Sequence, residues 1–333
     1  MSESTPELML WDACSNGDDT VVRALLNTDE PDVNPTDEAI NVNWVGPDRG
    51  DTPLHRACRF ENLQVVKTLL KWSAVDVNAR NLGQGTPLYI ACQNGRKEVV
   101  PLLLADRRTH VNKPENDGAT PFYIACEKGH KEVVALLLED LRIDINRPEK
   151  DQCTPLWMAS QLGMLEIVQL MLASGRDIDT KTKSIAGPAP WNDKTAAEVG
   201  RRQATRLRPA GESDEVFYRK KKNGPLIEVL LDTFDLEPGP TRQRLRELPG
   251  IRDPFIGDIF GLVIFLCDDL LTVSAADSSP ATRFFKIAQR LPMELQMVLC
   301  HRAYGSGKSS VLTRYSEPAF KKLGRLLART ESH

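Results

Sequence analysis

The sequence predicts an all-α solenoid, an array of short helical units stacked side by side, followed by a small helical domain. The first observation is a Thr-Pro dipeptide that recurs at Thr52, Thr86, Thr120 and Thr154, each 34 positions after the last. The second is that apolar stripes at helical spacing follow each copy, and the third is that Val-Asn or Ile-Asn pairs separate the units. Self-similarity at a period of roughly 20 to 50 residues is typical of repeat proteins, in which each unit buries its apolar face against its neighbours.

The recurring phrase predicts the first helix of each unit. Its four copies are Thr52–Ala57, Thr86–Ala91, Thr120–Ala125 and Thr154–Ala159. A Thr hydroxyl can accept hydrogen bonds from N–H groups left free at a helix start, and Pro fits the first helical position because its missing N–H would have no helical partner there. The Ala lets a neighbouring helix approach closely. A Gly follows the Ala by four positions in three copies, as Gly95, Gly129 and Gly163, and can end the helix in the left-handed conformation.

A second helix and an extended finger complete each unit. The apolar residues of the second helices lie at helical spacing: Val99, Val100, Leu103 and Leu104; Val133, Val134, Leu137 and Leu138; Ile167, Val168, Met171 and Leu172. The fingers then open at Val77-Asn78, Val111-Asn112 and Ile145-Asn146. This pattern resembles the ankyrin repeat, which has two antiparallel helices and a hairpin-like loop in each unit. The resemblance implies about five repeats plus a terminal half-repeat.

The resemblance covers about residues 5–208 and is weaker at both ends. Residues 5–28 predict a degenerate first repeat, as expected for a terminal unit that has one face in water. A Pro- and Asp-rich insertion follows at residues 27–40, and it is either a recognition loop or a solvated connection. Residues 194–200 resemble the first helix of a sixth, truncated repeat that closes the stack.

The chain beyond the array has a different character. Residues 209–223 are polar and charged, which predicts a linker, and residues 224–333 predict a small helical domain of no recognised family. Pro, Gly and Ser signals separate its candidate helices, which are Pro225–Phe234, Thr241–Leu248, Pro254–Val273, Ala281–Arg290, Met293–Ala303 and Pro318–Arg329. Residues 1–200 carry 21 Lys and Arg against 30 Asp and Glu, whereas residues 201–333 carry 22 against 16. This division predicts different partners for the two parts, or a contact between them.

Composition indicates a globular protein of a reducing compartment. The 333 residues are 41% hydrophobic and carry a net charge of −3. Residues 1–10 show no apolar secretory leader, and the most apolar stretch, Ile259–Cys267, is too short to span a bilayer. Four of the seven cysteines directly follow a repeat Ala, where Cys packs as a small hydrophobe; these are Cys14, Cys58, Cys92 and Cys126. We expect a cytoplasmic protein, with the nucleus as the alternative, and no membrane insertion.

No motif indicates an enzyme, and we expect no catalytic residue, cofactor or metal. Gly305–Ser309 looks like part of a phosphate-binding loop, but Arg302 stands where that motif needs Gly. No spacing of His and Cys fits a zinc site, and the sequence has no Gly-x-Ser-x-Gly nucleophile motif. An unrecognised enzyme in the C-terminal domain stays open as an alternative.

Two further stretches suggest other roles. Lys220–Lys222 could be read by nuclear import receptors or be solvated linker. Nucleic-acid binding is not expected, because few aromatic residues are interleaved with the basic ones. Leu291–Leu295 is similar to the start of an F-box-like motif, which would make the chain a substrate adaptor of a ubiquitin ligase. The same residues also fit a helix that begins with Pro292.

The resemblance implies protein–protein recognition through an extended concave surface. We therefore expect a monomeric scaffold or adaptor that binds a protein partner. By resemblance, the variable positions are the two after each Ala-Cys or Ala-Ser pair and those at the finger tips. The candidate partner-binding residues are Trp44, Arg59, Phe60, Leu82, Gln93, Asn94, Asn116, Glu127, Lys128, Lys150, Gln161 and Leu162. Phe60 and Leu162 are the preferred anchors, because they are apolar where solvated positions would be polar.

Overall fold

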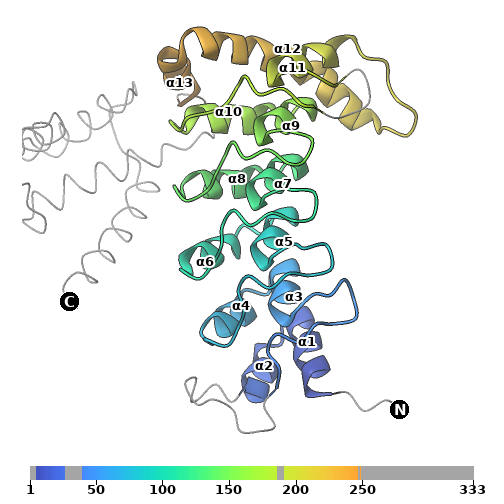
Figure 1. Ribbon diagram of the computed structural model, residues 1–333, viewed down its shortest axis with the longest axis vertical. Helices are drawn as coiled ribbons and strands as arrows, with labels where there is room; N and C mark the ends of the chain where they lie inside the picture. The colour runs from blue at the N-terminus through green and yellow to red at the C-terminus, as the bar shows by residue number, and fades with distance from the viewer. Residues whose placement is uncertain (1–4, 27–39, 186–190, 247, 249–333) are drawn as a thin grey trace, which may run out of the picture. The chain divides into compact units, whose positions relative to one another are not determined.

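The computed structural model describes residues 5–26, 40–185, 191–246 and 248. These residues form thirteen α-helices and no strand, and they divide into one unit that ends at Leu236 and a second that begins at Glu237. The first helices of the repeats are α1 (Pro6–Asn16), α3 (Pro53–Arg59), α5 (Pro87–Gln93), α7 (Pro121–Lys128) and α9 (Pro155–Gln161). The second helices are α2 (Asp19–Leu26), α4 (Leu63–Leu70), α6 (Val100–Ala105), α8 (Lys131–Leu138) and α10 (Leu165–Ala173). Figure 1 shows the two sets as two adjacent columns, which confirms the all-α solenoid.

The Thr-Pro phrase forms the predicted helix start. Oγ1 of Thr86 accepts a hydrogen bond from the backbone N–H of Tyr89 at 3.2 Å, and equivalent bonds form in the next two repeats. Gly129 ends α7 with a φ of 80°, so the left-handed helix end is also confirmed. In the second repeat, where no Gly is present, Glu61 adopts this conformation with a φ of 61°.

The Asn of each Val-Asn pair links one repeat to the next. The amide Nδ2 of Asn78 donates to the carbonyl of Arg108 at 2.7 Å, and its Oδ1 accepts from the backbone N–H of His110 at 2.7 Å. Asn43, Asn112 and Asn146 make the same pair of bonds to the repeat that follows them. The side chain thus satisfies two backbone groups that an extended segment would otherwise leave without partners.

Backbone hydrogen bonds also join the fingers. The N–H of Leu82 donates to the carbonyl of Arg49 at 3.0 Å, and the N–H of Lys150 donates to the carbonyl of Asp117 at 2.9 Å. Each finger tip is therefore held against the finger before it. Because these bonds are single and widely spaced, the described fingers remain hairpin-like loops without strand pairing.

The first repeat is degenerate in sequence but has the expected two helices. The hydroxyl of Thr5 accepts from the N–H of Leu8 at 3.3 Å, and Gly17 ends α1 with a φ of 79°. Trp11, buried on α1, donates its indole N–H to the carbonyl of Asp51 at 2.9 Å. This bond ties the terminal repeat to the second one.

The predicted truncated sixth repeat is α11 (Ala196–Thr205), and α12 (Asp214–Leu236) packs against it and contacts α9 and α10. The helix α12 differs from the linker expected over residues 209–223. Its buried side chains, at helical spacing, are Phe217, Ile227, Leu231 and Phe234. A Cβ on Gly224 would lie 2.5 Å from the carbonyl oxygen of Gly200, so paired glycines bring α11 and α12 into close contact.

The second unit is described only at its start. The helix α13 (Pro238–Arg246) covers part of the candidate helix Thr241–Leu248, and Pro225–Phe234 lies within α12. The four later candidate helices, Gly305–Ser309 and the F-box-like stretch Leu291–Leu295 lie outside the described residues.

Candidate interaction surface

A groove of about 660 Å³ lies where α5, α7 and α9 meet the fingers that precede α7 and α9. Three aromatic side chains, Tyr89, Tyr123 and Trp157, occupy equivalent positions 34 residues apart and line it. Each is the third residue of its helix, and its N–H is held by the capping Thr described above. The stacking of the repeats therefore places one aromatic ring per repeat along the groove.

The two tyrosine hydroxyls are free to bind a ligand. Tyr89 and Tyr123 are 7% and 3% exposed, and within the described part of the chain neither hydroxyl has a hydrogen-bond partner. Burial, together with nearby carboxylates such as Glu115 and Glu149, raises the pKa of both tyrosines. Both hydroxyls therefore stay protonated and can donate. The indole of Trp157 is fixed differently, because its N–H donates to the carbonyl of Lys194 at 2.9 Å.

The groove is acidic. Its charged lining residues are Glu115, Asp117, Glu127, Glu149, Asp151 and Lys128. Lys128 pairs with Glu127 at 2.8 Å. Finger geometry holds two of the other carboxylates in place: Glu115 accepts from the N–H of Asp117 at 2.8 Å, and Glu149 accepts from the N–H groups of Asp151 and Cys153. The groove thus presents fixed negative charge above buried aromatic rings.

Four of the predicted partner-binding residues line the groove: Gln93, Glu127, Lys128 and Gln161. The finger residues Leu82, Asn116 and Lys150 are exposed at the tips but do not line it. Trp44 is half-buried at the first described finger. Asn94 is half-buried too, and its amide donates to the carbonyl of Ile90 on its own helix at 2.8 Å.

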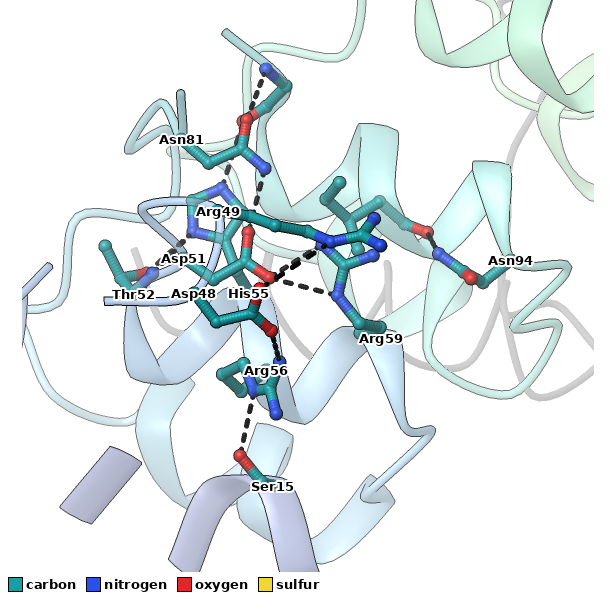
Figure 2. Close-up of polar contacts among 12 residues, drawn as sticks. Ser15, Asp48, Arg49, Asp51, Thr52, His55, Arg56, Arg59, Asn81 and Asn94 are labelled. Atoms are coloured by element: carbon teal, nitrogen blue, oxygen red, sulfur yellow. Dashed lines mark hydrogen bonds and ion pairs between the residues drawn. The ribbon is translucent and has the colours of Figure 1, made fainter. Parts of the chain in front are cut away.

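Figure 2 shows where Arg59 lies. Its guanidinium donates to Oδ2 of Asp51 from Nε at 3.0 Å and from Nη2 at 2.6 Å, and Asn81 donates to Oδ1 of the same carboxylate at 2.8 Å. Asp51 is fully buried, and the Arg59 side chain is 11% exposed. Nε and Nη2 of Arg59 are therefore engaged inside the array.

The preferred anchors lie in different surroundings. Phe60 is 46% exposed, and its ring lies 4.8 Å from the guanidinium carbon of Arg56, which also stacks over Trp11 at 4.1 Å. Leu162 is half-buried, and its carbonyl accepts from Nε of Arg219 on α12 at 3.2 Å. Phe60 is therefore the more open of the two, because α12 packs beside Leu162.

The aromatic and finger carboxylate residues are the part of the groove that the sequence interpretation did not select. Tyr89, Tyr123 and Trp157 stand in the buried stripe of the first helix, and that position predicts core packing. Their repetition with aromatic character every 34 residues is the signal that could have found them. The carboxylates repeat in the same way, with Glu149 and Asp151 each 34 residues after Glu115 and Asp117.

We also searched the described residues for a metal site, a membrane-spanning helix and reactive cysteines. They contain no group of three or more His, Cys, Asp or Glu side chains that could hold a metal ion, and no helix among them is long and apolar enough to cross a membrane. Burial raises the pKa of the repeat cysteines Cys14, Cys58, Cys92 and Cys126. These thiols therefore pack as neutral, unreactive hydrophobes.

The stacked two-helix units, with fingers on one side and a lined groove, define a repeat solenoid of the interaction-module class. A family model described as ankyrin repeats matches residues 10–115 and 107–182. Since this match covers more than half of the 333 residues, the chain belongs to the ankyrin-repeat family. No curated protein matches the chain. Ankyrin repeats are generally protein-interaction modules, and their domains are typically non-enzymatic.

Proposed function

We propose that this chain is a non-enzymatic scaffold or adaptor that binds a protein partner in the groove along α5, α7 and α9. The observation that carries the proposal is the convergence of Gln93, Glu127, Lys128 and Gln161 in one groove of about 660 Å³. These are positions that ankyrin resemblance assigns to partner binding, and they come from three consecutive repeats.

The chemistry of the groove favours a protein over other ligands. Buried aromatic rings beside polar side chains are the composition typical of residues that dominate protein interfaces. Fixed carboxylates disfavour phosphate groups, and therefore nucleic acid. The groove is also shared by several repeats, so an extended segment of a partner can contact all of them at once.

The finger tips and the N-terminal repeats extend this surface in the proposal. Leu82 is 74% exposed, and the tip residues Asn116 and Lys150 are exposed beside the groove. Phe60 and Trp44 offer apolar contacts nearer the N-terminus. Arg59, Asn94 and Leu162 already make hydrogen bonds within the protein. We therefore propose that they contribute less to partner binding than the groove residues do.

Affinity capture with the full-length protein tests this function. The groove variant Gln93→Ala/Gln161→Ala shortens two lining side chains, and the control variant Lys97→Ala/Glu132→Ala alters two exposed residues that do not line the groove. We expect proteins captured by the wild type to be lost or strongly reduced with the groove variant and retained with the control. Equal capture by both variants at unchanged melting temperature would exclude the groove as the binding surface.

A further inference from the structure

We infer that the groove binds a basic segment of its protein partner, with Arg side chains of that segment placed between the finger carboxylates and the aromatic rings. This inference rests on the proposed function and names the chemistry of the partner. Three features carry it: unpaired carboxylates, unpartnered tyrosine hydroxyls and aromatic rings in one groove.

The first feature is uncompensated negative charge. No described cationic side chain pairs with Glu115, Glu149 or Asp151, whereas Glu127 has Lys128 and Asp117 has Lys150 at 3.5 Å. A recess lined by one sign of charge concentrates the electric field and attracts ligands of the opposite charge. A cationic segment therefore gains attraction before it makes any direct contact.

The second feature is the pair of tyrosine hydroxyls. Tyr89 and Tyr123 are more than nine-tenths buried and line the groove, but neither hydroxyl has a partner among the described residues. Neither hydroxyl oxygen is among the described buried polar atoms that lack a partner, so both open to the groove and can donate to a bound ligand. A peptide carbonyl laid along the groove would accept these bonds, which indicates a segment of main chain and not an isolated cation.

The third feature is the match between aromatic rings and a guanidinium. Arg stacks on Tyr and Trp faces and donates paired hydrogen bonds to carboxylates, whereas Lys is a compact, strongly hydrated charge. The chain already contains such a contact, since the Arg56 guanidinium stacks over Trp11 at 4.1 Å. Tyr89, Tyr123 and Trp157 are 7%, 3% and 3% exposed, so only a small part of each ring borders the groove. Because these parts repeat once per ankyrin unit, beside the repeated finger carboxylates, they suit a segment with several spaced Arg residues.

Fluorescence anisotropy with full-length protein tests the inference. The probe is a fluorescein-labelled peptide of alternating Arg and Gly, compared with the same peptide carrying Glu in place of Arg. The groove variant is Glu115→Gln/Asp151→Asn, chosen because Gln keeps the acceptor for the Asp117 N–H and the Asp151 side chain accepts no described hydrogen bond. The control, Glu98→Gln/Glu132→Gln, removes the same charge from exposed residues outside the groove.

We expect the Arg peptide to bind the wild type and the Glu peptide not to bind. The groove variant should weaken binding by about tenfold or more, and the control by less than about twofold, since paired charge-assisted hydrogen bonds are lost only in the groove. Tyr123→Phe, which removes only the hydroxyl, should weaken binding by a few-fold. Equal affinity of the wild type and the groove variant, or no binding of the Arg peptide, would overturn the inference.

Two groove variants distinguish failure of this inference from failure of the proposed function. If Gln93→Ala/Gln161→Ala abolishes partner capture and Glu115→Gln/Asp151→Asn does not, the groove binds a partner that is not basic, and only the inference fails. If neither variant changes capture, the proposed function fails as well.

Discussion

Asp51 and Arg59 form a buried ion pair within the second repeat, and Asn81 links this pair to the third repeat. Both guanidinium bonds go to one carboxylate oxygen, at 3.0 and 2.6 Å, while Asn81 of the next repeat donates to the other oxygen at 2.8 Å (Figure 2). Because Asp51 is 0% exposed, these partners replace the water that would otherwise solvate its carboxylate. Arg59, chosen from the sequence for partner binding, thus also stabilises the array.

Replacing Arg59 should therefore destabilise the protein. Arg59→Ala leaves the Asp51 carboxylate buried without its cation, which typically costs about 3–5 kcal/mol. Arg23→Ala is the control, since Arg23 pairs with Asp19 in an i,i+4 contact and its side chain is 52% exposed; it should cost less than about 1 kcal/mol. Urea denaturation measures both, and equal losses for the two variants would contradict the structural role of Arg59.

His55 should make the stability of the array depend on pH. Its Nδ1 accepts from the N–H of Thr52 at 3.1 Å, so the proton sits on Nε2, 3.0 Å from the carbonyl of Gly85. Burial lowers the pKa of His55 from its usual 6.5, although Asp51 and Asp76 raise it in part and Arg59 adds to the lowering. The folded protein therefore binds the proton less readily than the unfolded chain.

As the pH falls below 6.5, the unfolded chain gains a proton that folded His55 does not, so stability decreases by up to about 1.4 kcal/mol per pH unit. Urea denaturation at pH 7.5 and 5.5 measures this. His55→Gln should reduce the difference between the two pH values, whereas His110→Gln, at an exposed position, should keep it. A wild-type protein no less stable at pH 5.5 would refute the assignment.

The asparagine bridges between repeats predict that two asparagines of one finger differ in their contribution to stability. Asn112 donates to the carbonyl of Arg142 at 2.6 Å and accepts from the N–H of Asp144 at 2.7 Å. Asn112→Ala should cost about 1–3 kcal/mol, because it loses two intramolecular hydrogen bonds that each contribute about 0.5–1.5 kcal/mol net. Asn116→Ala, at an exposed finger tip, should change stability by less than about 0.5 kcal/mol. Thermal and urea unfolding would contradict this account if the order of the two were reversed.

The close packing of α11 against α12 predicts that Gly224 tolerates no side chain. A Cβ there would lie 2.5 Å from the carbonyl oxygen of Gly200 and 2.6 Å from Cβ of Gln203. Gly224→Ala should separate the helices and raise hydrogen exchange over residues 214–236. Gly239→Ala, which meets nothing within 4 Å, is the control. Fast exchange over residues 214–236 in the wild type itself would mean that this segment is a linker.

The sequence predicted well those features that depend on neighbouring residues. The Thr-Pro spacing located the first helices and their caps, since the capping bond joins residues three apart, as between Thr86 and Tyr89. The Val-Asn pairs were recognised as markers, but their role was not, because the partners of Asn78 lie 30 and 32 residues away. Such distant contacts become visible only once the repeats are stacked.

The same limit explains the two main differences. The basic run Arg219–Lys222 suggested a solvated linker, yet Phe217 and Gly224 on either side of it are buried, and Gly224 lies against Gly200 of α11. In the groove, the sequence interpretation selected polar residues at the C-terminal end of each first helix but not Tyr89 and Tyr123, which share the buried stripe and still line the groove. Helical spacing identifies an apolar stripe but not which of its members border an open recess.

Site-specific photo-crosslinking tests most directly the claim that partners bind in the groove. A photoactivatable amino acid would replace Lys128, which lines the groove on α7, or Glu132, which is exposed on α8 of the same repeat and does not line it. In Figure 1 these helices lie in different columns. The account predicts that partners captured by the full-length protein crosslink from position 128 and not from position 132. Crosslinking from position 132 alone would show that partners bind the second helices and would contradict the assignment of the groove.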